Sequence, residues 1–286
     1  MRGQVLLLWC TTPIHPGVGR EAEGTVDLPI QKEGSTGLPF IPASSIKGAF
    51  SSRSLSLSLP EGELAFIFGS IDAAGGLLFA DAHLLFFPVT SLRGGVAWVT
   101  SPLILMRFDR ALKSVGIRRP DVQLPFEIPE GRCLTPPESE LTIEAGNKNW
   151  VILYNKIALE ANPHDFLMRL TAWLAQMLPN KYLQKAIPRR ILAVNDGLIR
   201  ILAERGLDYL TRIRLKKGIR RVEERGLWTE EHLPSQTLLY TSLTTTHRLS
   251  DAEILNRLLS AEWLQLGGDE STGRGFIKVT KVVQDV

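Results

Sequence analysis

The feature that most constrains the fold is a long segment, residues 14–42, between the first expected strand and the first expected helix. The apolar run QVLLLWCTT (4–12) predicts a strand that ends at Pro13. The segment that follows is rich in glycine and proline and carries acidic residues. A loop of this length inside a compact domain is uncommon and is usually functional. The chain must therefore build its sheet around a loop that has a role of its own.

Length and composition indicate an ordinary globular protein. The chain has 286 residues, 44% hydrophobic and 22% charged, so it can bury a large core. Its longest apolar runs are the length of strands and too short to span a membrane, and the start of the chain does not resemble a secretory signal. Only two cysteines occur, Cys10 and Cys133, without metal-site spacing. We expect a cytoplasmic protein with no disulfide and no membrane partner.

The charge is unevenly distributed along the chain. Residues 1–100 carry 6 lysines and arginines against 8 acidic residues, whereas residues 181–230 carry 13 against 6. A concentrated positive charge is typical of a protein that contacts a polyanion. A solvated helix face is the ordinary alternative, and charge alone does not decide between the two.

The order of expected elements indicates an α+β fold of ferredoxin-like type with insertions. Residues 109–149 are rich in proline and charge and look like an excursion from the core. The run 189–202 looks strand-like with an Asn-Asp-Gly turn. Residues 211–226 alternate, with Arg212, Arg214 and Lys216 on one face and Ile213 and Leu215 on the other. This alternation around a Lys-Gly turn predicts a two-stranded arm.

Two short motifs are candidate phosphate sites. The loop GGDESTGRG (267–275) has backbone amides able to cradle phosphate oxygens, and we single out Gly267, Gly268, Gly273, Arg274 and Gly275. A plain connecting turn is the alternative for this loop. The second motif is SSIKG (44–48), where we expect Ser44 or Ser45 to cap a helix. Together with Lys47 the free helix amides form an anion site, unless this is only an ordinary cap with a solvated lysine.

Asp27 is the acid of most interest. It lies in the long loop within the apolar setting TVDLP, with His15 upstream. A lone loop aspartate is most often a turn residue. A single carboxylate can also hold a divalent ion, such as Mg or Mn, when a substrate phosphate supplies the other oxygens. An acidic loop, phosphate-binding glycines and a basic arm together indicate a protein that holds RNA or DNA by its backbone and cuts it.

The same residues resemble a known family. The blocks are, in chain order, HPGVG with GTVDLPIQKEGSTGLPFIPASSIKGAF, FG (68–69), FADAHLLFFPVTSLRGGVAWVTSPLIL, LWTEEHLPSQTLLYTSL and LQLGGDESTGRG. They are similar to the RNA-cleaving backbone subunit of type III-B CRISPR effector complexes, a RAMP protein. One departure is Ala43, where the family usually has glycine. The resemblance runs nearly from end to end.

The resemblance implies a single RAMP domain over 1–286. Its RRM-like palm carries a catalytic loop (14–42), a helical insertion, an insertion at 109–149 and a β-hairpin thumb in 180–235. Copies would stack into a filament on CRISPR RNA beside other subunits of the complex. The family's essential aspartate falls on Asp27, and metal-dependent cleavage of target RNA follows.

The resemblance also suggests two accessory catalytic residues. These are His15 and an acid of TEEHLP, for which Glu230 is favoured over Glu231, with His232 beside it. The cationic face of the arm would grip phosphates, and its apolar face (Ile213, Leu215, Ile219 and Val222) would wedge between bases. We expect no base stacking on the sheet because the RRM aromatic signature is missing. The alternatives are a non-catalytic RNA-coating subunit and a CRISPR repeat-processing endoribonuclease.

Overall fold

The computed structural model describes residues 3–19, 26–56, 61–119, 127–216, 218, 221–246, 256, 258–260 and 262–284. These residues form a mixed α+β fold, which confirms the predicted class. The described α-helices are α1 (Ala43–Ser56), α2 (Glu61–Phe68), α3 (Pro102–Ser114), α4 (Asp165–Ala175), α5 (Lys181–Arg190) and α6 (Asp196–Arg205). Among the described residues, no helix has both the length and the apolar character needed to cross a membrane.

The strands form one large sheet and a separate two-stranded arm. The large sheet runs in the order β14-β15-β1-β13-β4-β5-β10-β6-β9-β8-β7, with β2 added beside β4 and β3 beside β13. In chain order its strands are β1 (Gly3–Cys10), β2 (Phe40–Ile41), β3 (Leu77–Phe79), β4 (Ala82–Ser91), β5 (Gly95–Thr100), β6 (Arg132–Thr135), β7 (Thr142–Ala145), β8 (Lys148–Leu153), β9 (Ile157–Pro163), β10 (Ile191–Ala193), β13 (Leu238–Thr245), β14 (Trp263–Gln265) and β15 (Phe276–Lys281).

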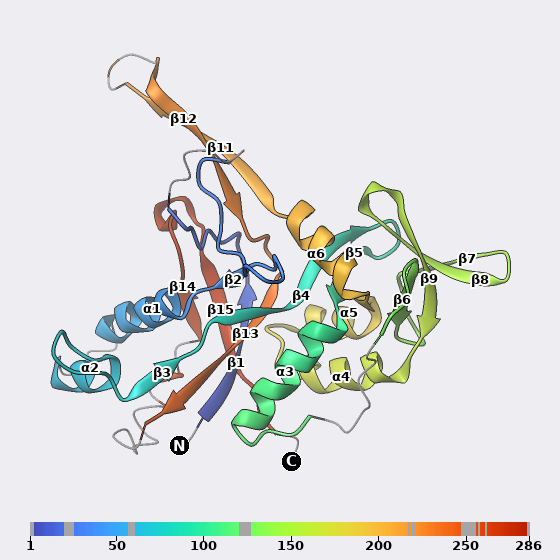
Figure 1. Ribbon diagram of the computed structural model, residues 1–286, viewed down its shortest axis with the longest axis horizontal. Helices are drawn as coiled ribbons and strands as arrows, with labels where there is room; N and C mark the ends of the chain where they lie inside the picture. Colours follow the sequence, from blue (N-terminus) through green and yellow to red (C-terminus); the bar gives the residue numbers. More distant parts are fainter. Residues whose placement is uncertain are drawn as a thin grey trace.

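Strand β1 is the centre of one half of the sheet. It pairs antiparallel with β13 on one side and with β15 on the other. The residues from Val5 to Cys10 are all buried, as a strand covered on both faces requires a continuous apolar run. Helices α1 and α2 lie at one end of the molecule in Figure 1, and α3, α4 and α5 lie between them and the β7–β8 hairpin at the other end. Burial raises the pKa of the Cys10 thiol, so this cysteine is an inert part of the core.

The predicted serine cap of the first helix is wrong. Helix α1 begins at Ala43, and its first amide donates to the Asp81 carboxylate at 2.7 Å. Ser44 and Ser45 therefore lie inside the first turn. Asp81, in the connection between β3 and β4, caps this helix in place of a local serine. A carboxylate is favourable there because it lies near the free amides at the start of the helix.

Two further segments differ from the expectations. In the strand-like run, only Ile191–Ala193 is a strand; Asn195 then accepts a hydrogen bond from the Leu198 amide at 2.8 Å and caps α6. Residues 109–149 include the end of α3 and strands β6 and β7, and β6 pairs with both β9 and β10. The described part of that segment is thus joined to the sheet.

The predicted arm is confirmed and is longer than its sequence pattern suggests. Strands β11 (Asp208–Leu215) and β12 (Val222–His232) pair antiparallel with an irregularity between Ile213 and Leu215. The arm projects away from the sheet at the top of Figure 1. Of the predicted thumb region 180–235, the part before residue 208 supplies α5, β10 and α6 and not the arm. Lys217 and Ile219 lie outside the described residues.

Candidate active site

The long loop returns to the molecule by pairing with the base of the arm. The Leu28 amide donates to the Thr229 carbonyl at 3.1 Å, and the Glu231 amide donates to the Leu28 carbonyl at 3.0 Å. The Asp27 carboxylate is exposed and accepts a hydrogen bond from the Thr229 amide at 2.8 Å. Backbone pairing therefore fixes the position of Asp27, although six loop residues, 20–25, lie outside the described part.

His15 is oriented by the same strand. Its Nδ1 lies 2.6 Å from the Glu231 carbonyl oxygen. A carbonyl can only accept, so Nδ1 carries the proton and Nε2 of the neutral ring keeps its lone pair. Reciprocal hydrogen bonds between Ile14 and Leu233, at 2.9 and 2.7 Å, hold the backbone beside the ring. His15 is thus set up to accept a proton at Nε2.

Glu230 lies in a buried ionic cluster behind this surface. Its carboxylate is 5% exposed and accepts from Arg212 Nε at 2.8 Å and from Trp228 Nε1 at 2.7 Å. Arg212 also pairs with Asp269 of the glycine-rich loop. Burial acts to raise the pKa of Asp269, but contacts with Glu230 and Arg212 hold it below its ordinary value. Arg212 is therefore engaged with two carboxylates, which differs from its expected place on a phosphate-gripping face.

His232 completes the buried cluster. It is fully buried, its Nε2 lies 3.5 Å from Asp269, and its ring centroid is 5.3 Å from that of His15. Burial lowers the pKa of His232. Ligand atoms of Glu230, His232 and Asp269 lie within 4.8 Å of one another, but the Arg212 guanidinium is already paired with both carboxylates and offsets one of their two negative charges. This set fits a divalent ion poorly, whereas Asp27 offers a carboxylate at the surface.

Glu231 is as buried as Glu230 but has different hydrogen-bond partners. It is 5% exposed and accepts from the Ile30 amide at 3.2 Å and from Lys32 Nζ at 3.0 Å. The two neighbouring acids thus bind different things, since Glu230 joins the arm to the glycine-rich loop and Glu231 ties the long loop to the arm.

The glycine-rich loop packs against the His15 segment. A Cβ on Gly267, where φ is +80°, would lie 2.5 Å from the His15 carbonyl oxygen, and one on Gly275 would lie 2.3 Å from the Leu266 oxygen. These two glycines are required by close packing. Gly268 and Gly273 have open space around the Cβ position, so they remain the part of the loop that a phosphate can approach. Arg274 is half-buried.

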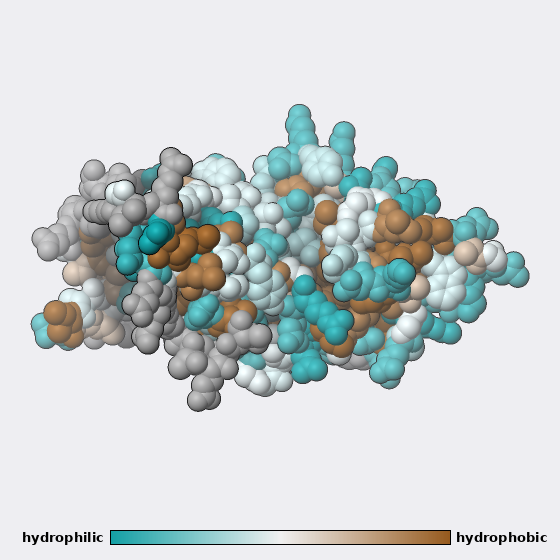
Figure 2. All heavy atoms as spheres, turned by 90° about the horizontal axis from the view of Figure 1, so that it is seen from above, coloured by the Kyte–Doolittle hydropathy of each residue, from teal (hydrophilic) through white to brown (hydrophobic). Residues whose placement is uncertain are grey.

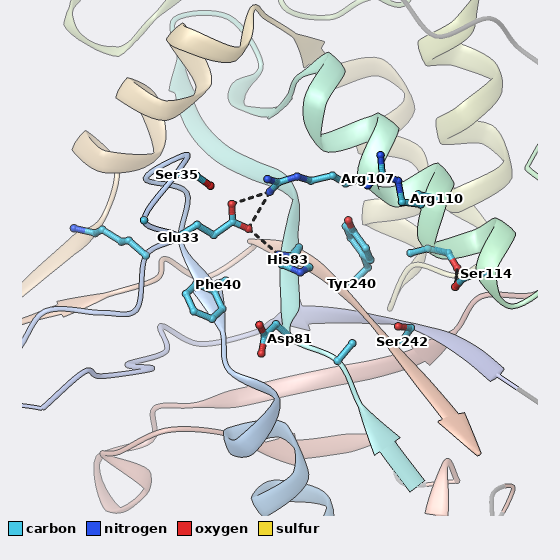
Figure 3. Close-up of a pocket in the computed structure, with 14 residues that line it drawn as sticks. Glu33, Ser35, Phe40, Asp81, His83, Arg107, Arg110, Ser114, Tyr240 and Ser242 are labelled. Carbon is cyan, nitrogen blue, oxygen red and sulfur yellow. Dashed lines mark hydrogen bonds and ion pairs between the residues drawn. The ribbon is translucent and has the colours of Figure 1, made fainter. Parts of the chain in front are cut away.

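A cavity adjoins the long loop. It measures about 640 Å³ and lies between the loop, α3, β4 and β13. Figure 3 shows Glu33 reaching into it toward His83 and Arg107, at 2.8 and 2.7 Å. Burial acts to raise the pKa of Glu33, but hydrogen bonds from His83, Arg107 and Thr36 lower it to about 2. This network fixes the end of the loop that carries Asp27.

Comparison with known proteins identifies the family. The RAMP superfamily profile matches residues 8–278. The CRISPR system Cmr endoribonuclease Cmr4 of Pyrococcus furiosus is 36% identical over 98% of this chain and 96% of that protein. The chain belongs to the RAMP superfamily. Its relatives within it are Cmr4 proteins, as the identity and near-complete coverage show.

Solved structures show the same fold. A crystal structure of oligomeric Cmr4 from Pyrococcus furiosus has a TM-score of 0.77 at 31% identity, covering 98% of both chains. A chain of the type III-B Cmr-beta complex bound to cognate target RNA has a TM-score of 0.76 at 22% identity, covering 99% of this chain and 98% of that one. The second match, at its low identity, shows the fold alone.

The structure brings together some of the predicted site residues and adds others. Asp27, His15 and Glu230 all lie at the base of the arm, with Glu230 buried behind the other two. Ser44, Ser45 and Lys47 lie on α1, and Lys216 lies on the outer arm. Sequence reasoning missed the roles of Asp269, Trp228, Lys32 and Asp81. Asp269, Lys32 and Asp81 act on partners that are distant in the sequence, so no local pattern marks them. Trp228 acts on Glu230 two residues away, but the sequence does not show that the two side chains share one face of the strand.

Proposed function

We infer that this chain is the RNA-cleaving backbone subunit of a type III-B CRISPR effector complex, which coats a guide RNA and cuts complementary target RNA. The main supporting observation is that the loop with Asp27 pairs with the base of the arm. Backbone groups of the same strand, β12, therefore hold both Asp27 and His15. Family membership and the relative named an endoribonuclease support the same function.

The chemistry that suits these groups is attack by the ribose 2′-hydroxyl on the adjacent phosphorus. The 2′-oxygen forms a bond to phosphorus, the P–O5′ bond breaks, and O5′ takes up a proton from solvent. His15 Nε2 accepts the 2′ proton, and Asp27 orients the hydroxyl. Products are a 2′,3′-cyclic phosphate and a 5′-hydroxyl. Alignment of the 2′-oxygen with the leaving group supplies much of the rate.

A divalent ion, Mg or Mn, fits this proposal at Asp27. The exposed carboxylate would hold the ion together with phosphate oxygens of the RNA, as Mg²⁺ sites commonly use only one or two carboxylates. A bound ion would supply neutralisation of the phosphate charge. The chain's own contribution is to present Asp27 at a fixed place, through the Thr229 amide.

Binding of RNA is assigned to three surfaces. The half of the sheet around β1 serves as a ferredoxin-like palm, and the arm serves as a thumb that displaces a target nucleotide. Lys47 and the open glycines Gly268 and Gly273, with Arg274, contact the guide backbone. Arg214, on β11, and Lys216, directly after it, are both exposed and contact phosphates along the arm. Sequence choice then comes from base pairing to the guide, as in other guided effectors.

Oligomeric Cmr4 and the complex bound to target RNA suggest how copies of this chain work together. We place several copies in a filament on one CRISPR RNA, next to the other subunits of the complex. Each copy, a single RAMP domain over 1–286, makes one cut, so the products are evenly spaced.

The test is to assemble the complex with a guide and to follow cleavage of a matched target RNA with and without EDTA. We expect evenly spaced cuts that EDTA abolishes, with cyclic phosphate ends. Binding without cleavage would show a non-catalytic coating subunit. Metal-free cutting of repeat RNA by the lone chain would show a repeat-processing enzyme.

A further inference from the structure

A groove lies between α1 and the hairpin of β14 and β15, on a part of the molecule that the cleavage chemistry does not use. It has a volume of about 610 Å³. One wall is a face of α1, and the other is the outer face of the hairpin. Its lining includes Ser45, Gly48, Ser52, Trp263, Gln265 and Phe276.

The hairpin wall presents two aromatic rings to solvent. Trp263 pairs with Lys278 and Gln265 pairs with Phe276 in the antiparallel register. Because side chains alternate along a strand, these four lie on one face, and the intervening Leu264 and Ile277 point into the core. Trp263 is 49% exposed and Phe276 is 37% exposed. An aromatic pair held on a rigid sheet face, open to water, needs a ligand with a flat apolar surface.

The position of the Trp263 ring is fixed by charge. The Lys278 ammonium lies 5.0 Å from the ring centroid and also pairs with Glu262. A cation over a ring is attracted to its negative face. The ring is therefore already oriented, with the ion pair of Lys278 and Glu262 beside it.

The α1 wall leaves room for a ligand. A Cβ on Gly48 would meet nothing within 4 Å, so the middle of this helix face is open. Ser45 and Ser52 place hydroxyls along the same wall, and Gln265 places an amide on the other. Arg53 also lines the groove. Aromatic rings beside a cation and neutral hydrogen-bonding groups are typical of sites for single-stranded nucleic acid. The one acid of the lining, Glu270, lies at the end formed by the glycine-rich loop.

A protein partner would need a different lining. The core of a protein–protein interface is depleted of charged residues, whereas this groove includes Arg53 and Glu270. The groove is also bounded by Gly267 of the glycine-rich loop and by Ser45 of α1, next to the two places assigned to the guide backbone. RNA that follows those backbone contacts passes over the aromatic pair.

We propose that this groove binds bases of the single-stranded guide RNA by stacking, with Trp263 as the main stacking surface and Phe276 as the second. The proposal rests on the assigned function and adds to it a contact with bases. It departs from the expectation that the sheet makes no stacking contact, because these rings lie on the outer hairpin and outside any RRM signature. Stacking tolerates any base, so guide sequence is not restricted.

The experiment measures the affinity of the full chain for two fluorescent RNA oligonucleotides of equal length, one intact and one with abasic nucleotides. Trp263→Ala should weaken binding of intact RNA by about 5- to 100-fold. It should leave binding of abasic RNA unchanged, since the phosphates are the same. The salt dependence should keep its slope, because no phosphate contact is lost. Trp263→Phe should restore most of the affinity.

Two further variants make the result specific. Gly48→Leu fills the open space on the α1 wall without a backbone penalty. It should weaken the binding of intact RNA in the same way as Trp263→Ala. Trp150→Ala is the matched control, since Lys148 lies 5.9 Å from the Trp150 ring on strand β8, away from the groove. It should leave both affinities unchanged.

Equal losses on intact and abasic RNA would overturn the proposal, because the ring would then act only through structure. Unchanged RNA affinity with loss of self-association would overturn it by making the groove a protein contact. A wild-type chain that binds no RNA would overturn the assigned function as well. Binding and cleavage that survive in Trp263→Ala would refute the stacking contact alone.

Discussion

The base and the outer half of the arm are built from the same two strands but differ in burial. At the base, Glu230 is 5% exposed and pairs with Arg212, which also holds Asp269. Further out, the apolar residues Ile213, Leu215, Val222 and Leu227 are between 49% and 58% exposed. One part has polar groups buried and paired, and the other has apolar groups open to water. Each arrangement is costly unless it has a partner.

The partners explain the difference. The charges at the base find theirs within the chain, so this part sets the geometry of the Asp27 loop. The apolar outer half has none among the described residues, which suits a surface that meets RNA. Figure 2 looks from the side toward which the arm projects and shows apolar side chains exposed beside polar ones. A fixed base and an exposed apolar outer half suit the proposed thumb, which would displace a nucleotide.

Substitution at the base of the arm should have the largest effect on the free energy of unfolding. Arg212→Ala leaves Glu230 and Asp269 without their cation, and we expect a loss of about 3 kcal/mol in the free energy of unfolding. Cleavage should fall with it, because the base positions Asp27. Urea unfolding of the chain measures the first effect. In the control, Arg214→Ala removes an exposed arginine 5.6 Å from the Trp228 ring and should cost at most about 1 kcal/mol. Equal losses would remove the distinction.

The outer half should affect cleavage without affecting folding. Ile213→Ser with Leu215→Ser removes apolar surface that replaces stacking when a base pair opens, and about 2 kcal/mol of that support should be lost. Cleavage at regular positions should weaken while the melting temperature stays the same. Ile71→Ser, another exposed apolar residue in a loop, is the control. An unchanged ladder of products would mean that the arm does not displace a nucleotide.

The Glu33 network should give a pH-dependent contribution to stability. The pKa of Glu33 is lowered from its ordinary value of 4.5 to about 2 in the folded chain. Between these two pH values the unfolded chain therefore binds more protons at this residue than the folded chain does. Stability from this group is present above pH 4.5 and is lost as pH falls toward 2. Glu33→Gln should cost about 1 kcal/mol at pH 7 after allowing for screening, with the difference shrinking in acid. The hydrogen bond from Lys148 also lowers the pKa of Glu160, but that pair is more exposed, so Glu160→Gln should show the same trend at a smaller size.

The smallest effect is expected at the guide contacts. Lys47→Ala with Arg274→Ala should weaken RNA binding uniformly across guide sequences and reduce the slope of log affinity against log salt by roughly one for each lost phosphate contact. Titrations at several salt concentrations measure it. A slope that does not change would assign both residues to structure.

The sequence predicts those elements whose signal is local. The alternation from Arg212 to Lys216 predicts the arm because strand periodicity needs only neighbouring residues. The run after Ala193 misleads because leucine and isoleucine suit strands and helices alike, and the deciding signal is the Asn195 cap. The setting of the long loop singles out Asp27, and the family resemblance gives it the essential role.

Long-range partners account for what the sequence does not show. The Asp81 cap of α1 depends on the β3–β4 connection, which brings it to a helix far back in the chain. Arg212 has the same alternation as Arg214, and the positions of Glu230 and Asp269 decide that the first is half-buried in an ionic cluster. Burial of a charge depends on the fold that surrounds it.

The most direct test of the account is Asp27→Ala in the assembled complex, with binding and cleavage measured on the same target RNA. One exposed carboxylate adds little to an affinity set by phosphate contacts, but it is central to the proposed chemistry. We therefore predict unchanged affinity in a gel-shift assay and loss of cleavage at every regular position. Full cleavage by the variant, or affinity that falls in step with activity, would contradict the account.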